Sequence, residues 1–351
     1  MSGVEYGSKP SALSEARIYK EAGMKSRKSL IGIALTISLL ASLWVCSGAA
    51  AQEKLVAYYS PPAGGGAFTL VAGQVTVTNR YMGGGYKFVH EQTTGTLEIV
   101  RRLATAQSQK KDAFGDFGST DGYNAWKGRA EYTGKAFPGL RSIAYNQLVD
   151  LYLAVPANSS IKTFADVKGK RIGMGGPGSS VANTGFLILQ QYGVKKEDFK
   201  PFYFVYKEII EGIQDGSLDG GLLAGGYPMP SFLELSTRNN VRIIPVDEKI
   251  ANKIIQEQPG YYTGIVKAKS YKGVDQDTRI LGWTGTIWTH SGVSDDLVYK
   301  FIKNLFDHKE EYFAVHQDAK ELKLQEYNKG VAVPFHPGAE KYFKEMGVWK
   351  K

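Results

Sequence analysis

The sequence has very little of what disulfide, thiol or clustered metal chemistry needs. Its 351 residues include a single cysteine, Cys46, and five histidines that occur one at a time along the chain. Neither H-E-x-x-H nor G-x-S-x-G occurs. A disulfide needs two cysteines, and zinc sites draw on Cys and His ligands at close spacing. We therefore expect no disulfide, no metal, no cofactor and no catalytic residues, which argues against a secreted hydrolase.

Long runs of one charge are also missing. The chain carries 43 Lys and Arg against 34 Asp and Glu, and residues 1–51 hold six of the former and three of the latter. Residues 52–351 are therefore left with a net charge of +6, spread among acidic residues. This balance gives a weak attraction for anions and none of the basic patches that bind nucleic acid.

One apolar run stands out, near the N-terminus. Lys25, Arg27 and Lys28 precede the apolar stretch 30–45, and small residues follow at 48–51. This order is typical of a secretory signal peptide, so we expect a signal at 24–51, cleavage after Ala51 and a periplasmic protein. Residues 1–23 would be an upstream leader or a misassigned start. A membrane anchor is the alternative, but about 20 apolar residues are needed to span a bilayer. A lipoprotein at Cys46 is disfavoured by the bulky Trp44 and Val45 before it.

Beyond residue 51, short apolar strands alternate with helices. Leu297, Phe301 and Leu305 fall on one face of a helix that Ser294 can cap. A last helix begins at Pro337 and ends near Gly347. This alternation predicts an α/β fold with mainly parallel sheets. Further strands are expected at 54–59, 151–155, 171–174 and 218–224, and further helices at 179–192 and around 209–216.

The Gly-rich turn 173–178 lies between an expected strand and an expected helix. It matches G-x-G-x-x-G, and the acids Glu197 and Asp198 follow about 20 residues later, as in dinucleotide-binding enzymes. Pro177 removes a backbone amide inside the turn, and an exported protein has no access to the cytoplasmic nicotinamide pool. We therefore favour an anion site made by free N–H groups and the hydroxyls of Ser179 and Ser180. The alternative is that these serines only cap their own helix.

Several Gly-rich and Ser/Thr-rich segments occur in a characteristic order. They are 62–68 (PAGGGAF), 93–98 (TTGTLE), 161–171 (IKTFADVKGKR), 175–180 (GGPGSS), 215–221 (DGSLDGG), 225–230 (GGYPMP), 298–300 (VYK) and 336–342 (HPGAEKY). Through them, residues 53–347 resemble the TAXI family, the TRAP-associated extracytoplasmic immunogenic proteins. These proteins are the binding subunits of one class of tripartite ATP-independent (TRAP) transporters. The order of the segments is more specific than any one of them.

The resemblance implies a two-lobed periplasmic binding protein of type II, each lobe a mainly parallel sheet flanked by helices. Lobe 1 would comprise 52–150 and 266–351, and lobe 2 would comprise 151–265. A monomer would capture a small organic anion, a carboxylate or an amino acid, and deliver it to a TRAP membrane subunit of fused large and small components. Helix N-termini can bind such an anion without a lysine. The ligand contacts that it implies are Gly65, Gly66, Phe68, Thr94, Gly95, Thr96, Ser119, Gly178, Ser179, Ser180, Asn183, Thr184, Tyr227 and Pro228.

Four positions depart from the family's pattern. Ala67 and Phe68 stand in place of hydroxyl-bearing residues, and Ile99 stands where the family often has Asn. Asp116 falls where the family usually has an apolar residue. We expect Asp116 in a salt bridge or on the surface, with a ligand amine as its alternative partner. The losses of polar groups favour a less polar organic acid, aromatic or branched. A periplasmic subunit that acts on a sensor kinase would use the same fold, and the sequence does not separate the two roles.

Overall fold

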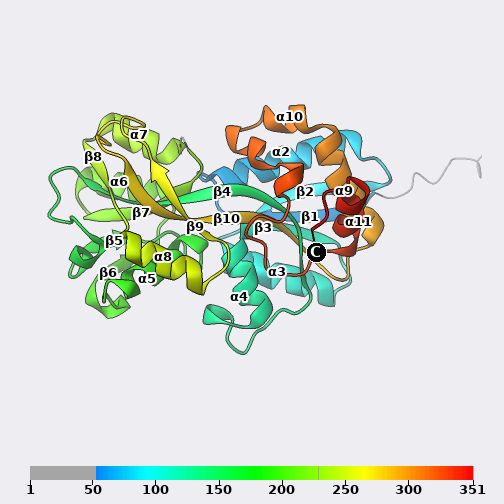
Figure 1. Cartoon of the computed structure of the whole chain (residues 1–351), viewed down its shortest axis with the longest axis horizontal. Helices are drawn as coiled ribbons and strands as arrows, with labels where there is room; N and C mark the ends of the chain where they lie inside the picture. Colours follow the sequence, from blue (N-terminus) through cyan, green and yellow to red (C-terminus); the bar gives the residue numbers. More distant parts are fainter. Residues whose placement is uncertain (1–52, 228, 351) are drawn as a thin grey trace, which may run out of the picture. The chain divides into compact units, whose positions relative to one another are not determined.

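The computed structural model describes residues 53–350 except residue 228. The expected signal peptide, its cleavage site after Ala51, Cys46 and Pro228 lie outside these residues. Within them, ten strands form one continuous sheet with helices packed around it (Figure 1). The main order is β2-β1-β3-β10-β4-β7-β5-β6, with β8 paired to β4 and β9 to β10. The strands are β1 (Lys54–Ser60), β2 (Tyr86–Gln92), β3 (Ala113–Gly118), β4 (Leu140–Pro156), β5 (Arg171–Gly173), β6 (Lys200–Phe202), β7 (Gly220–Gly225), β8 (Val241–Ile244), β9 (Tyr261–Val266) and β10 (Thr278–His290).

The direction of the strands changes at the middle of the sheet. β1, β2 and β3 are parallel to one another at one end, and β5, β6 and β7 are parallel at the other. The long strands β4 and β10 lie between these ends and are antiparallel to all their paired neighbours. The expected α/β architecture with flanking helices is confirmed, and the sheet is mixed because the two long strands join its parallel ends. We refer to the β1–β3 end as the first half and to the β5–β7 end as the second half.

The helices begin where the sequence places caps and turns. At α9, Ser294 Oγ accepts a hydrogen bond from the Leu297 N–H at 3.3 Å, and Asp295 and Asp296 lie in the favourable first turn. Pro337 is the first residue of α11, as expected. No helix of the described residues is long and apolar enough to cross a membrane. The α-helices are α2 (Gly66–Tyr81), α3 (Thr96–Ser108), α4 (Ser119–Lys127), α5 (Ser180–Gln191), α6 (Tyr206–Asp215), α7 (Pro230–Arg238), α8 (Glu248–Glu257), α9 (Asp295–Asp307), α10 (Lys309–Phe313) and α11 (Pro337–Glu345).

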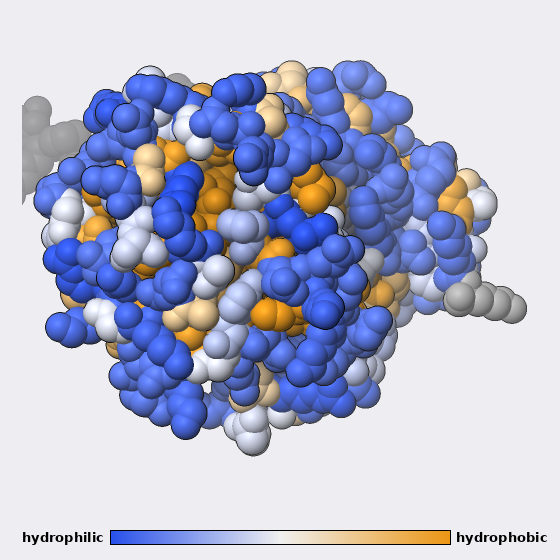
Figure 2. Space-filling model, turned by 60° about the vertical axis from the view of Figure 1, so that its left-hand side comes forward, coloured by the Kyte–Doolittle hydropathy of each residue, from blue (hydrophilic) through white to orange (hydrophobic). Residues whose placement is uncertain are grey.

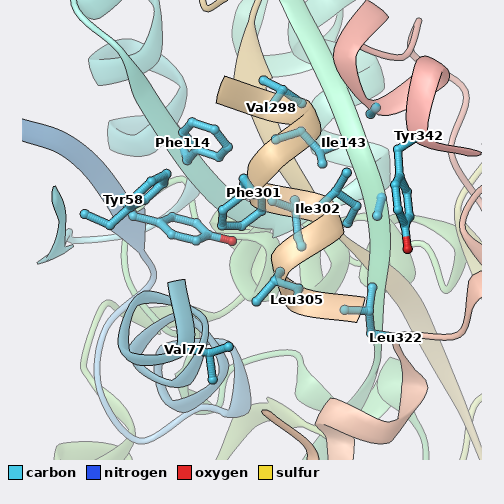
Figure 3. Packing of buried hydrophobic residues seen from close by; sticks show 14 of the residues in the cluster. Tyr58, Val77, Phe114, Ile143, Val298, Phe301, Ile302, Leu305, Leu322 and Tyr342 are labelled. Atoms are coloured by element: carbon cyan, nitrogen blue, oxygen red, sulfur yellow. The ribbon is translucent and has the colours of Figure 1, made fainter. Parts of the chain in front are cut away.

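Apolar side chains form separate cores in the two halves. In the first half, Phe301 and Ile302 of α9 and Tyr342 of α11 pack with Phe114 of β3 and Ile143 of β4 (Figure 3). The other face of this half carries α3 and α4 on a second cluster. The second half holds two further clusters, one with α5 and α8 and one with α6 and α7. The surface seen in Figure 2 is mostly hydrophilic, with hydrophobic residues in small separate patches.

Candidate ligand-binding cleft

A cleft lies at the middle of the sheet, where turns from both halves meet. The turns after β1 and β2 and the carboxyl end of β3 reach it from the first half, and the turns after β5 and β6 and the carboxyl end of β7 reach it from the second. Ligands of α/β proteins commonly bind at the carboxyl ends of parallel strands. β4 and β10 complete the wall. The lining residues are Pro61, Pro62, Ala63, Gly65, Gly66, Ala67, Phe68, Thr94, Gly95, Thr96, Asp116, Phe117, Gly118, Gln147, Val149, Gly175, Gly176, Ser179, Ser180, Val181, Phe204, Val205, Tyr206, Ala224, Gly225, Trp283 and Gly285.

The N-cap residues of five helices, α2, α3, α4, α5 and α6, line this cleft. The residues before α2 and α3 are Gly65 and Gly95, and neither helix has a side-chain cap, so no side chain of the N-cap occupies their first N–H groups. α5 differs, because Ser179 Oγ accepts from the Ala182 N–H at 3.2 Å. The N-terminus of a helix carries about half a positive charge. Among the described residues, no Lys, Arg or His lines the cleft, so the helix ends are its main source of positive potential.

Two glycines let the turns of the two halves touch. Gly95 has a φ of 144°, and a Cβ on it would lie 3.3 Å from Ser179 Cβ. A Cβ on Gly176 would lie 2.7 Å from the carbonyl oxygen of Thr94, closer than real Cβ atoms approach. Beside them, the hydroxyls of Thr96 and Ser180 are 2.9 Å apart and share a hydrogen bond. The structure therefore has direct contacts across this edge of the cleft.

Asp116 of β3 lies in the wall of the cleft and is fully buried. Its Oδ2 accepts from Asn146 Nδ2 at 2.5 Å, whereas its Oδ1 has no hydrogen-bond partner. Asn146 is held by Gln74, which donates to Asn146 Oδ1 at 2.9 Å. Burial raises the pKa of Asp116 to about 8, although the side-chain amides of Asn146 and Gln147 act in the opposite direction. The carboxyl group thus lies in an apolar setting supported by neutral donors.

Two further acidic residues, Asp121 of α4 and Glu131 after it, form hydrogen bonds with residues of α5. Ser180 Oγ donates to Asp121 Oδ2 at 2.5 Å. Asn183 Nδ2 donates to Asp121 Oδ1 at 3.0 Å and to Glu131 Oε1 at 2.7 Å. Burial raises the pKa of Asp121, and burial together with the nearby Asp121 raises the pKa of Glu131 to about 7. These hydrogen bonds join α4 and the turn after it to α5, and so connect the two halves.

The structure brings most of the expected turn residues together. Gly65, Gly66, Phe68, Thr94, Gly95, Thr96, Ser179 and Ser180 all line the cleft. The expected residues Ser119, Gly178, Asn183, Thr184 and Tyr227 lie outside its lining.

Those outside the lining have other partners. The Ser119 hydroxyl is 2.6 Å from Thr286 Oγ1, and the Thr184 hydroxyl is 3.1 Å from the Tyr261 hydroxyl. Tyr227 is half exposed and its ring packs edge-on against Tyr271. Asn183 is occupied by the two acids described above. Gly178 accepts at its carbonyl from the Leu97 N–H at 3.3 Å, another contact across the cleft.

The expectation that Asp116 is exposed or salt-bridged is wrong. It is completely buried, and none of the ion pairs among the described residues includes it. One signal of burial is present in the sequence, because Asp116 lies in the run Ala-Phe-Gly-Asp-Phe-Gly, which is otherwise uncharged. Ile99, the other departure, is also buried but packs against Gly115 and not into the cleft.

Part of the wall consists of residues that were not expected at the site. Gln147 of β4 lines the cleft, and its Oε1 is buried without a hydrogen-bond partner. It lies in a long strand whose middle was not expected to be a strand. Phe117, Val149, Phe204 and Trp283 add a largely apolar surface, consistent with the expected loss of polarity at Ala67 and Phe68. No group of three or more His, Cys, Asp or Glu in the described ranges could hold a metal ion.

The solved structures to which this chain is similar include three binding proteins. The periplasmic aliphatic sulphonate binding protein SsuA from Escherichia coli is 17% identical over 77% of this chain and 80% of its own, with a TM-score of 0.44. A binding protein component of an ABC phosphonate transporter from Pseudomonas aeruginosa is 11% identical over 79% and 80%, with a TM-score of 0.46. An ancestral arginine-binding protein bound to arginine is 15% identical over 76% and 98%, with a TM-score of 0.48. A family model matches residues 60–347, and the chain therefore belongs to the NMT1-like family.

Proposed function

We propose that this protein is a periplasmic solute-binding protein that captures a small organic anion and does not transform it. One observation carries the proposal: five helix N-termini from both halves of the sheet meet at a cleft that no described cationic side chain lines. Helix ends of this kind bind anions through backbone N–H groups. The apolar wall, with Phe68, Phe117 and Trp283, favours a ligand with an aromatic or branched body.

The expected affinity follows from the number of hydrogen bonds that the turns can make. A hydrogen bond to a charged group contributes about 1.5–3 kcal/mol. Four or five of them from the first turns of α2, α3 and α5 would give about −8 kcal/mol after ordering costs, a micromolar dissociation constant. We expect a screen of organic acids and amino acids by thermal shift to find such a ligand. The bound compound should be recovered unchanged after long incubation, and steady turnover of it would contradict the proposal.

We further propose that the two halves act as lobes that close on the ligand. Lobe 1 would comprise 52–150 and 266–351, and lobe 2 would comprise 151–265, with β4 and β10 as the connecting strands. The contacts of Thr96 with Ser180 and of Asp121 with Asn183 across the cleft support a closed arrangement.

As the partner we propose a TRAP membrane subunit of fused large and small components, on the resemblance to the TAXI family. Two of the similar proteins are named for aliphatic sulphonates and for phosphonates, and the phosphonate protein is described as part of an ABC transporter. A TRAP membrane subunit and an ABC transporter differ in their source of energy, because only the ABC transporter hydrolyses ATP. Reconstituted uptake with purified protein and a TRAP membrane subunit should proceed without ATP. Uptake that requires an ATP-hydrolysing permease would replace TRAP delivery by ABC delivery, and signalling through a kinase without uptake would favour the sensory role.

Export is proposed from the N-terminal pattern at 24–51. Mass spectrometry of the periplasmic fraction should find a chain that begins at Gln52. A membrane-bound form that retains residues 24–51 would contradict cleavage, and with it the placing of the receptor free in the periplasm.

A further inference from the structure

Two acceptor atoms in the wall of the cleft have no donor. Asp116 Oδ1 and Gln147 Oε1 are both buried, both belong to lining residues, and neither makes a hydrogen bond within the described chain. Buried polar atoms in native proteins are nearly always paired, so an unpaired one needs an explanation. Here two of them belong to residues that line one cavity, Asp116 on β3 and Gln147 on β4. A ligand that brings donors would pair both.

The rest of the Asp116 environment is built to support an acceptor. Gln74 donates to Asn146 Oδ1, and Asn146 in turn donates to Asp116 Oδ2 at 2.5 Å, while Tyr58 donates to Gln74. Every hydrogen bond in this series is directed toward the carboxyl group. All four side chains are buried, so the series holds Asp116 through Oδ2 and leaves Oδ1 without a partner. No Lys, Arg or His of the described residues lines the cleft to neutralise it.

One of the two acceptors, Gln147 Oε1, also lies close to the positive end of α2. A Cβ on Gly66 would lie 2.9 Å from Asp318 Oδ2 and 3.4 Å from Gln147 Oε1, so a carboxyl oxygen and the amide oxygen both face the first turn of that helix. A ligand that extends from the first turn of α2 to Gln147 would meet N–H donors at one end and an acceptor at the other. This pairing suits a molecule with both an anionic and a donor-bearing group.

We propose that the cleft binds a zwitterionic ligand, whose ammonium group donates to Asp116 Oδ1 with Gln147 Oε1 as second acceptor and whose carboxylate faces the helix N-termini. The inference rests on the proposed function and narrows its ligand from organic anions to amino-bearing acids with an apolar body. Asp116 is then a specificity-determining residue, which separates amino acids from the corresponding simple acids.

Matched probes test this directly. L-Phenylalanine, 3-phenylpropanoate and 2-phenylethylamine form one set; L-leucine, 4-methylpentanoate and 3-methylbutylamine form a second; and 5-aminopentanoate with pentanoate forms a third. Their affinities are measured by calorimetry on the purified protein and on Asp116→Asn. In the unmodified protein, the amino acid of at least one set should bind about tenfold or more tightly than its simple acid, since an interaction with a charged group is involved.

We define the preference as the affinity for the amino acid divided by the affinity for the simple acid of the same set. In Asp116→Asn this ratio should fall to about one, while the affinity for the simple acid stays the same or improves. The matched control is Asp112→Asn, the same substitution just before β3 at a buried carboxyl that pairs with Lys54 outside the cleft. It should keep the preference. If Asp116→Asn does not fold, Gln147→Met provides the second test, and it should reduce the preference severalfold.

Three results would overturn the proposal: a preference that is absent in the unmodified protein, a preference that survives in Asp116→Asn, or no binding of any amino-bearing probe. Binding of the simple acids in any of these cases would leave the proposed function standing. If neither the simple acids nor the amino acids bind, both the inference and the proposed anion-binding function fail.

Discussion

Asp116 should destabilise the ligand-free protein, because a carboxyl group buried without a cation resists ionisation. Its pKa in the folded state is raised to about 8, above its value in the unfolded chain. The destabilisation is therefore absent in acid, where both states are protonated, and grows as the pH rises toward 8. Each unit of pKa difference corresponds to about 1.4 kcal/mol. We predict that Asp116→Asn raises the free energy of unfolding at pH 7.5 by a few kcal/mol and changes it little at pH 3.5.

Urea unfolding of both proteins at the two pH values measures this difference. Asp112→Asn serves as the comparison, because it removes an ion pair with Lys54 at 2.6 Å and should not stabilise the protein at neutral pH. An Asp116→Asn protein that is less stable than the unmodified one at pH 7.5 would show that the carboxyl is satisfied in the free protein. If Asp116→Asn makes the protein more stable and also removes its discrimination between amino acids and simple acids, Asp116 serves binding and lowers stability.

The same raised pKa predicts how affinity for an amino-bearing ligand changes with pH. Below about pH 8 Asp116 is neutral in the free protein, and an ammonium group binds only after the carboxyl loses its proton. Affinity for L-phenylalanine or L-leucine, whichever binds, should therefore rise between pH 6 and 8, by up to about tenfold per unit. The phenols that face Asp116, Tyr58 and Tyr312, stay protonated in this range because burial raises their pKa.

Calorimetry in buffers of different ionisation heat should detect release of a proton on binding at pH 7. The measured heat of binding should vary with the ionisation heat of the buffer, and the part of this variation that Asp116 causes should vanish in Asp116→Asn. Any variation that remains in Asp116→Asn measures other acids such as Glu131. Equal variation in the two proteins would mean that Asp116 does not ionise when the ligand binds.

Residues of the site could be predicted where their role depends on neighbours in the sequence, and not where it depends on partners that are distant in the sequence. The glycines at 65, 66 and 95 are recognisable because turns that place backbone N–H groups at a ligand need small residues, and all three line the cleft. Hydroxyl and amide side chains are harder, since Asn183 follows the cap of α5 as expected and yet donates to Asp121 and Glu131. Those acids come from about 50–60 residues earlier in the sequence, and no local pattern reports that approach.

At the scale of the element, the two serines that begin α5 have different tasks. Ser179 caps its own helix through the Ala182 N–H, whereas Ser180 contacts Asp121 and Thr96 of the first half. We predict that Ser179→Ala lowers the free energy of unfolding by about 1 kcal/mol and leaves affinity nearly unchanged. Ser180→Ala should instead weaken ligand binding about tenfold, because it removes hydrogen bonds that form across the cleft.

The two variants serve as controls for each other, since each removes one hydroxyl at neighbouring positions. Affinity for the ligand found in the screen is measured well below the melting temperature, so that loss of helix stability does not mimic loss of binding. A result in which Ser179→Ala weakens binding as much as Ser180→Ala would assign the Ser179 hydroxyl to the ligand. Normal binding by both variants would mean that neither hydroxyl contributes to the bound state.

Elements whose ends are set locally were predictable, and elements set by distant partners were not. Ser294 at α9 and Pro337 at α11 mark helix starts that the structure confirms. β4 was expected only at 151–155, whereas it runs over Leu140–Pro156. Its middle contains the polar residues Asn146 and Gln147, which interrupt the apolar pattern. Asn146 accepts from Gln74 in the buried network, and Gln147 lines the cleft. The antiparallel direction of β4 and β10 likewise depends on contacts that are distant in sequence.

At the scale of the whole molecule, the two halves are joined by β4 and β10 and touch again across the cleft. If the halves are closing lobes, as we propose, opening the cleft would expose Asp121 and Glu131, whose pKa values burial raises in this structure. The closed state therefore holds more protons than the open state, so protonation favours closure and rising pH opposes it. The phenols of Tyr132 and Tyr261 face the same acids and stay protonated, because burial raises their pKa.

We predict that the ligand-free protein has a smaller radius of gyration at pH 5.5 than at pH 8.5, with Glu131 titrating near pH 7. Saturating ligand should give the small radius at both pH values, because turns from both halves then share one bound molecule. Glu131→Gln removes one ionisation and keeps an acceptor for Asn183, so it should reduce the change with pH. Small-angle scattering measures each case. A radius that is the same with and without ligand at pH 8.5 would indicate a rigid cleft, and the proposal of closing lobes would have to be abandoned.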